Sequence, residues 1–74
     1  MEDKLRELEE REREAREIRR READWAYINS LPPRVKSAVI LFIERGDLRL
    51  AQRLSGLDLE DFIEHLRRAR VWVW

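Results

Sequence analysis

The chain has 74 residues, a length that suits one domain with a modest core. Charged residues make up 43% of it, well above the share of about a quarter in an average protein, which indicates that much of the chain is a solvated helix. Sixteen basic residues balance 16 acidic residues and there is no cysteine, so the composition excludes a bulk basic field for nucleic acids, disulfides and thiolate metal sites.

The composition also bears on location and cofactors. No apolar run reaches the length of a membrane span, and the charged N-terminus is unlike a signal peptide, so we expect a soluble protein of the cytoplasm. A single histidine cannot build a multi-histidine site, and we expect no metal and no other cofactor. The abundance of Arg and Glu, with only two glycines, is compatible with a thermophile.

The first 29 residues predict one long charged helix. No Pro or Gly occurs before Pro32, and pairs such as Glu7 and Arg11 recur at the four-residue spacing that stabilises exposed helices. Two interpretations of this helix remain open: a coiled-coil arm that joins two copies, or a single solvated helix. The dimerisation candidates are apolar side chains near heptad spacing: Leu5, Leu8, Ala15, Ile18 and Trp25. The apolar stretch 25–28 is expected to dock on the C-terminal half of the chain.

A break and a buried helix follow. Pro32 and Pro33 stop the first helix and can begin the next one, because the missing N–H of proline costs nothing in the first turn. Residues 34–45 contain an uninterrupted apolar run, which predicts a central helix that is buried on most sides. Gly46 is expected to end this helix.

The next stretch predicts two helices joined by a tight turn. Asp47 can cap a short helix, and Gly56 ends it because only a residue without a β-carbon accepts the left-handed conformation cheaply. Asp58 is expected to cap the second helix through its carboxylate. Leu57 and Phe62 have the spacing of a hydrophobic staple. A short helix, a glycine turn and a longer helix outline a helix-turn-helix.

The last four residues, Val-Trp-Val-Trp, favour an extended conformation over further helix. One tryptophan could fold back onto the helices, or the tail could join another chain by strand addition or as an aromatic anchor; we favour the second interpretation. The predicted fold is therefore all-α: a long charged N-terminal helix (1–29), a compact trihelical helix-turn-helix core (30–70) and a short extended C-terminal tail (71–74).

Several segments together form a recognisable pattern. They are Ala38 to Ile43, the turn Arg45-Gly46-Asp47, the stretch Leu50 to Leu57, the inward Phe62, Ile63 and Leu66, and the exit Arg67, Arg68 and Val71. In these segments the chain resembles a family of small archaeal helix-turn-helix proteins, the VapB-type antitoxins, which are encoded beside PIN-domain ribonuclease toxins. The resemblance implies an antitoxin with a PIN-type toxin as its partner. We also expect a homodimer.

The resemblance also suggests how the partner is inhibited. A PIN-type ribonuclease holds a divalent ion with a cluster of carboxylates, and an inserted arginine can neutralise such a cluster through paired, charge-assisted hydrogen bonds. The candidate partner-binding residues are the basic run and the tail: Arg67, Arg68, Arg70, Val71, Trp72, Val73 and Trp74.

The alternative function is a small dimeric helix-turn-helix transcriptional regulator that binds DNA. Its recognition helix would carry Glu60 and Asp61 in the first turn, where acidic groups repel phosphates, so DNA binding is not favoured. Arg49 and Arg53 are the candidate phosphate contacts, whereas the run Arg19–Arg21 is more typical of a solvated helix face. A third alternative is a scaffold subunit without an enzymatic target.

Catalysis is not expected, because no nucleophile has a base beside it in the sequence. Ser30, Ser37 and Ser55 have cap, helix and turn explanations. His65 is expected to be a partly buried imidazole with a hydrogen-bond partner rather than a general base.

Overall fold

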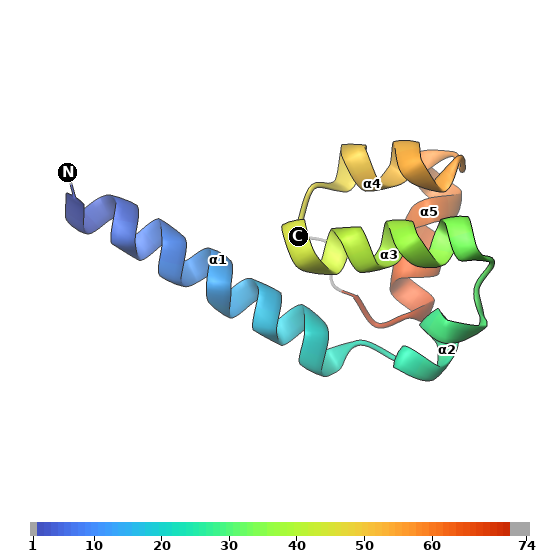
Figure 1. The fold of residues 1–74 in the computed structure, drawn as a ribbon, viewed down its shortest axis with the longest axis horizontal. Coiled ribbons are helices and arrows are strands. Elements are labelled where there is room, and N and C mark those ends of the chain that lie inside the picture. Colours follow the sequence, from blue (N-terminus) through green and yellow to red (C-terminus); the bar gives the residue numbers. More distant parts are fainter. Residues whose placement is uncertain (1, 72–74) are drawn as a thin grey trace.

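The computed structural model describes the backbone of residues 2–71 and the side chains of residues 6–71. This part of the chain is all-helical, as predicted, and contains no strand. The helices are α1 (Glu2–Glu22), α2 (Trp25–Ser30), α3 (Pro33–Arg45), α4 (Leu48–Ser55) and α5 (Leu59–Arg68). Helices α2 to α5 form a compact body from which α1 projects (Figure 1). No helix of the described segment has both the length and the apolar character that crossing a membrane requires.

The prediction of one helix over residues 1–29 is wrong in its extent, because α1 ends at Glu22 and α2 is a separate helix. Asp24 makes the break. Its backbone is extended, its carboxylate accepts a hydrogen bond from the Tyr27 N–H at 3.1 Å, and its own N–H donates to the Ala69 carbonyl at 2.7 Å. An N-cap and a bond to the far end of the chain thus replace the helical bonds that Asp24 would otherwise make.

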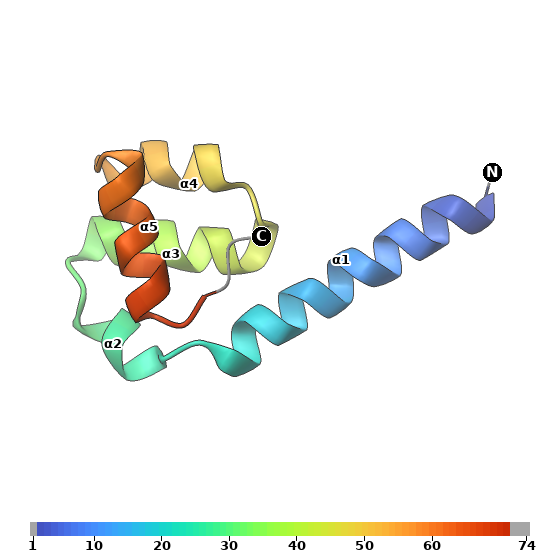
Figure 2. The same cartoon turned by 180° about the vertical axis from the view of Figure 1, so that it is seen from behind.

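Helix α3 begins and ends as the sequence predicts. Pro33 occupies its first turn, and Gly46 ends it with φ 70° and an N–H that donates to the Phe42 carbonyl at 2.7 Å. Val39 and Ile43 are fully buried. Helices α2 and α4 lie on opposite sides of α3, and α5 crosses α3 (Figures 1 and 2).

The caps of α4 are also confirmed, but the cap of α5 is not. The Asp47 carboxylate accepts the Leu50 N–H at 3.1 Å, and Gly56 follows α4 with φ 73°. Asp58 stands at the start of α5, yet its carboxylate makes no capping hydrogen bond, and only its backbone carbonyl accepts from Phe62 N–H. The three residues that follow Asp58 are exposed, so water can satisfy their amides.

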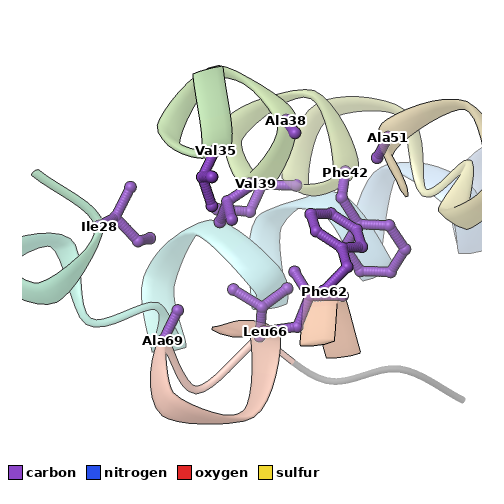
Figure 3. Packing of buried hydrophobic residues seen from close by; sticks show 11 residues of the cluster. Ile28, Val35, Ala38, Val39, Phe42, Ala51, Phe62, Leu66 and Ala69 are labelled. Atoms are coloured by element: carbon purple, nitrogen blue, oxygen red, sulfur yellow. The ribbon is translucent and has the colours of Figure 1, made fainter. Parts of the chain in front are cut away.

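One hydrophobic core joins the helices of the body. Side chains from four helices and from the segment after α5 meet in it (Figure 3). The core consists of Ile28, Val35, Ala38, Val39, Phe42, Ile43, Ala51, Phe62, Leu66, Ala69 and Val71. Leu57, the predicted staple partner of Phe62, packs against this core from its edge. Of the stretch 25–28, Ile28 docks as expected, whereas Trp25 and Ala26 are exposed.

Candidate functional site

Helix α5 ends in a left-handed turn that carries an arginine. The Arg70 N–H donates to the Arg67 carbonyl at 3.0 Å, and the Val71 N–H donates to the Leu66 carbonyl at 2.8 Å. These two bonds, with the buried pair Val71 and Leu66, form a Schellman motif. The motif fixes the direction in which the chain leaves the helix.

The residue in the left-handed position of this turn is Arg70, with φ 58°. It is the one non-glycine residue with positive φ in the described part of the chain. The left-handed conformation costs a residue with a β-carbon about 1–2 kcal/mol, and glycine is the usual solution at this position. Arg70 therefore makes the folded state less stable than glycine would at this position.

The structure divides the predicted partner-binding residues into groups. Arg67, Arg68 and Arg70 are exposed at the end of α5. Arg68 Nε lies 3.3 Å from a carboxylate oxygen of Glu64, while Arg67 and Arg70 make no ion pair with any described residue. Val71 is only 2% exposed and belongs to the core. Trp72, Val73 and Trp74 lie outside the described residues.

The candidate phosphate contacts lie on the outer face of α4. Arg49 and Arg53 are exposed, one helical turn apart. Leu50 and Leu54 lie next to them in the sequence and are 39% and 50% exposed. This face of α4 is thus both cationic and apolar.

The dimerisation candidates do not form one exposed seam. Ala15 and Ile18 are half-buried, whereas Leu8 is 62% exposed. The Trp25 indole N–H donates to the Arg20 carbonyl at 2.9 Å, so Trp25 caps the end of α1. The side chain of Leu5 lies outside the described side chains.

The prediction that the run Arg19–Arg21 is a solvated helix face is wrong for Arg19, which is buried. It is 5% exposed, and its Nε–H donates to the Ile43 carbonyl at 3.0 Å, near the C-terminal end of α3. Its guanidinium carbon lies 5.8 Å from the centre of the Phe42 ring. Arg20, by contrast, is exposed and pairs with Glu44, with 2.9 Å between Arg20 Nε and Oε1. The four-residue spacing from Ala15 to Arg19, on one helix face, was the available signal.

His65 has the environment that was predicted for it. It is half-buried, and its Nδ1 lies 2.8 Å from the Tyr27 hydroxyl. This hydrogen bond links α5 to α2. No group of three or more potential ligands among the described residues is placed to hold a metal ion.

Comparison of the chain with protein-family models, with curated proteins and with solved structures finds no match.

Proposed function

We propose that the chain is a protein-binding module, an antitoxin that inhibits a PIN-type ribonuclease through the basic segment at the end of α5. The observation that carries this proposal is Arg70 in a left-handed turn. Residues held in the left-handed region without being glycine cluster at active sites and ligand-binding sites. Arg70 is exposed and forms no ion pair with a described residue, so the most direct task for its side chain is to bind a partner outside the described chain.

The chemistry of the segment suits a carboxylate cluster. A guanidinium can give two parallel hydrogen bonds to a carboxylate, and Arg67 and Arg70 need not break an internal ion pair to do so. The buried Val71 holds the backbone beside Arg70, so little conformational freedom is lost when a partner binds.

In the same proposal, α3, α4 and α5 form a trihelical helix-turn-helix core, α1 is an arm, and the residues after Val71 form the tail. Val71, which the sequence analysis assigned to the tail and to the partner-binding residues, belongs to the core instead. The core acts as a scaffold that presents the end of α5. The residues after Val71 add an aromatic anchor beside the arginines.

A protein is preferred to a duplex because of the charges on α5. In a helix-turn-helix that binds DNA, the first turns of the recognition helix face the bases and the phosphates. Glu60 and Asp61 are exposed in the first turn of α5, where they would oppose phosphate. The same acids are favourable at the positive end of the helix dipole, which accounts for them without any ligand.

The test is binding of the chain to the protein encoded by the adjacent reading frame. Arg67→Ala and Arg70→Gly each remove one guanidinium, and the glycine suits the left-handed turn. Arg13→Ala is the matched control, because Arg13 is also an exposed arginine but lies on α1. We expect Kd to rise about tenfold or more for the first two variants and to stay within about twofold for the control.

A second variant probes the residues beyond the core. A chain that ends at Val71 keeps the Schellman motif and removes only Trp72, Val73 and Trp74, and it should bind more weakly than the full chain. Unchanged affinity of Arg67→Ala and Arg70→Gly would refute the proposal. Tight binding of random duplex DNA that falls steeply with added salt would favour the regulator instead.

A further inference from the structure

The apolar stripe of α1 is covered by the body over only part of its length. Ala15 and Ile18 are half-buried on this stripe, while Leu8, seven residues before Ala15, is 62% exposed. Seven residues correspond to almost two full turns, so Leu8 and Ala15 lie on the same side of the helix. Helix α1 projects from the body (Figure 2). The stripe continues onto Leu8, within the exposed residues 6–14 of this helix.

The projecting half of α1 is acidic. Residues 2–10 contain five acidic and two basic residues, a net charge of −3. Residues 6–14 are all exposed and contain five acidic and three basic residues, so a net charge of −2 surrounds an uncovered leucine. The segment has the character of an amphipathic acidic helix without a partner in its own chain.

The outer face of α4 has the complementary character. Residues 48–55 contain two basic and no acidic residues. Arg49 and Arg53 lie beside the exposed Leu50 and Leu54, and no described residue forms an ion pair with either arginine. In both views α1 runs away from the body on a path that does not pass α4, so the two surfaces of one molecule do not meet (Figures 1 and 2).

We infer that the acidic half of α1 docks on the basic, leucine-bearing face of α4 in a second copy of the chain. Leu8 covers Leu50 and Leu54, and acids such as Glu9 lie near Arg49 and Arg53. Because the two surfaces differ, two copies must exchange their α1 helices reciprocally to close a dimer. The contact buries leucines that each copy alone leaves in water. This surface is separate from the end of α5, so the inference does not rest on the proposed function.

Charge reversals with matched controls test the contact. At about 100° per residue, Glu9→Arg alters the flank of α1 about 100° around the helix from Leu8. Glu10→Arg makes the same change about 160° from Leu8, on the opposite side of the helix. Arg53→Glu reverses the α4 face. Lys36→Glu is its control, because Lys36 lies on the side of α3 that faces away from α4. Arg34 marks the side that faces α4, since its Nε–H donates to the Leu54 carbonyl at 2.9 Å, and Lys36 lies almost opposite Arg34 around the helix.

The measurement is sedimentation equilibrium of the full chain at low ionic strength, with circular dichroism as a check of folding. We expect a dimer whose dissociation constant rises roughly tenfold in Glu9→Arg and in Arg53→Glu, and returns toward the original value when both changes are combined. Glu10→Arg and Lys36→Glu should leave the constant within about twofold.

Two results would overturn the inference. A chain that stays monomeric up to about 1 mM has no such contact. A dimer that weakens with Glu9→Arg but not with Arg53→Glu pairs α1 with something other than α4.

Discussion

Replacing Arg19 with alanine should loosen the attachment of α1 to the body. Arg19 is the buried link between α1 and the C-terminal end of α3, where helix carbonyls carry partial negative charge. The guanidinium also fills the space beside Gly46, since a β-carbon there would lie 3.2 Å from Arg19 Nη2. One side chain thus supplies a hydrogen bond, a cation–π contact and packing at this junction.

The size of the effect follows from these contacts. The bond from the charged Nε–H to the Ile43 carbonyl contributes about 1.5–3 kcal/mol, and the contact with the Phe42 ring contributes about 0.5–2 kcal/mol. Two buried methylenes lost on truncation add about 1.6 kcal/mol. Arg19 Nη2 lies 4.0 Å from a carboxylate oxygen of Glu12 but is buried without a hydrogen-bond partner, and removing it returns about 1–3 kcal/mol. The net loss in free energy of unfolding is about 3 kcal/mol for Arg19→Ala.

Urea unfolding followed by circular dichroism measures this loss. Arg19→Met keeps the stem of the side chain and should lose only about 1.5 kcal/mol, since packing remains and the unpaired Nη2 is gone. Arg13→Ala, an exposed change on the same helix, should stay within about 0.5 kcal/mol of the parent chain. If Arg19→Ala also changes stability by less than about 1 kcal/mol, Arg19 does not anchor α1, and the reasoning is refuted.

Three further substitutions test single contacts. Arg70→Gly relieves the left-handed strain, and this gain exceeds the cost of the extra freedom that glycine gives the unfolded chain. The free energy of unfolding, measured in urea, should therefore rise by roughly 0.5–1 kcal/mol, and a fall would contradict the strain. Gly56→Ala should lower the free energy of unfolding by about 2 kcal/mol, because alanine would be held at φ 73° and its β-carbon would lie 2.9 Å from Arg34 Cζ. An unchanged melting temperature would show that the backbone and the Arg34 side chain adjust freely. Tyr27→Phe removes the bond to His65 and should cost about 1 kcal/mol in guanidinium unfolding, and a neutral result would mean that water replaces the hydroxyl.

The parts of the fold that the sequence predicts are those that neighbouring residues decide. Pro33 begins α3, Gly46 and Gly56 end α3 and α4, and Asp47 caps α4. Each of these residues acts on backbone groups within four positions of itself, so its identity is enough to predict the result. The all-helical class follows from the same local signals and from the near absence of glycine.

The parts that could not be predicted depend on residues far away in the chain. The helix breaks at Asp24 partly because its N–H is bonded to the Ala69 carbonyl, and Arg19 is buried because its hydrogen-bond acceptor is Ile43, 24 residues later. The spacing from Ala15 to Arg19 indicates only a shared helix face, and a sequence pattern gives no sign of either hydrogen-bond acceptor. Asp58 shows the opposite error, a local signal that the structure does not use. Its residue type predicts a side-chain cap for α5, but its carboxylate makes no capping hydrogen bond.

The candidate site shows the same division. The arginines at the end of α5 were chosen as candidates from their charge and their place before a hydrophobic tail, and all three are exposed. The burial of Val71 was not, because a Schellman motif is normally signalled by glycine, and here Arg70 takes the glycine position. The strained turn explains how adjacent residues can serve opposite purposes, with Val71 in the core and Arg70 in solvent.

The two proposed surfaces lie on different sides of the body, and this separation makes a further prediction. Helix α5 ends on the side of α3 where α2 lies, away from α4 (Figures 1 and 2). Substitutions at distant sites without shared contacts have nearly additive effects. Arg67→Ala should therefore weaken partner binding by the same factor with and without Arg53→Glu, and Arg53→Glu should weaken self-association by the same factor with and without Arg67→Ala. A coupling above about 0.5 kcal/mol in titration calorimetry would mean that the partner and the second copy compete for one surface.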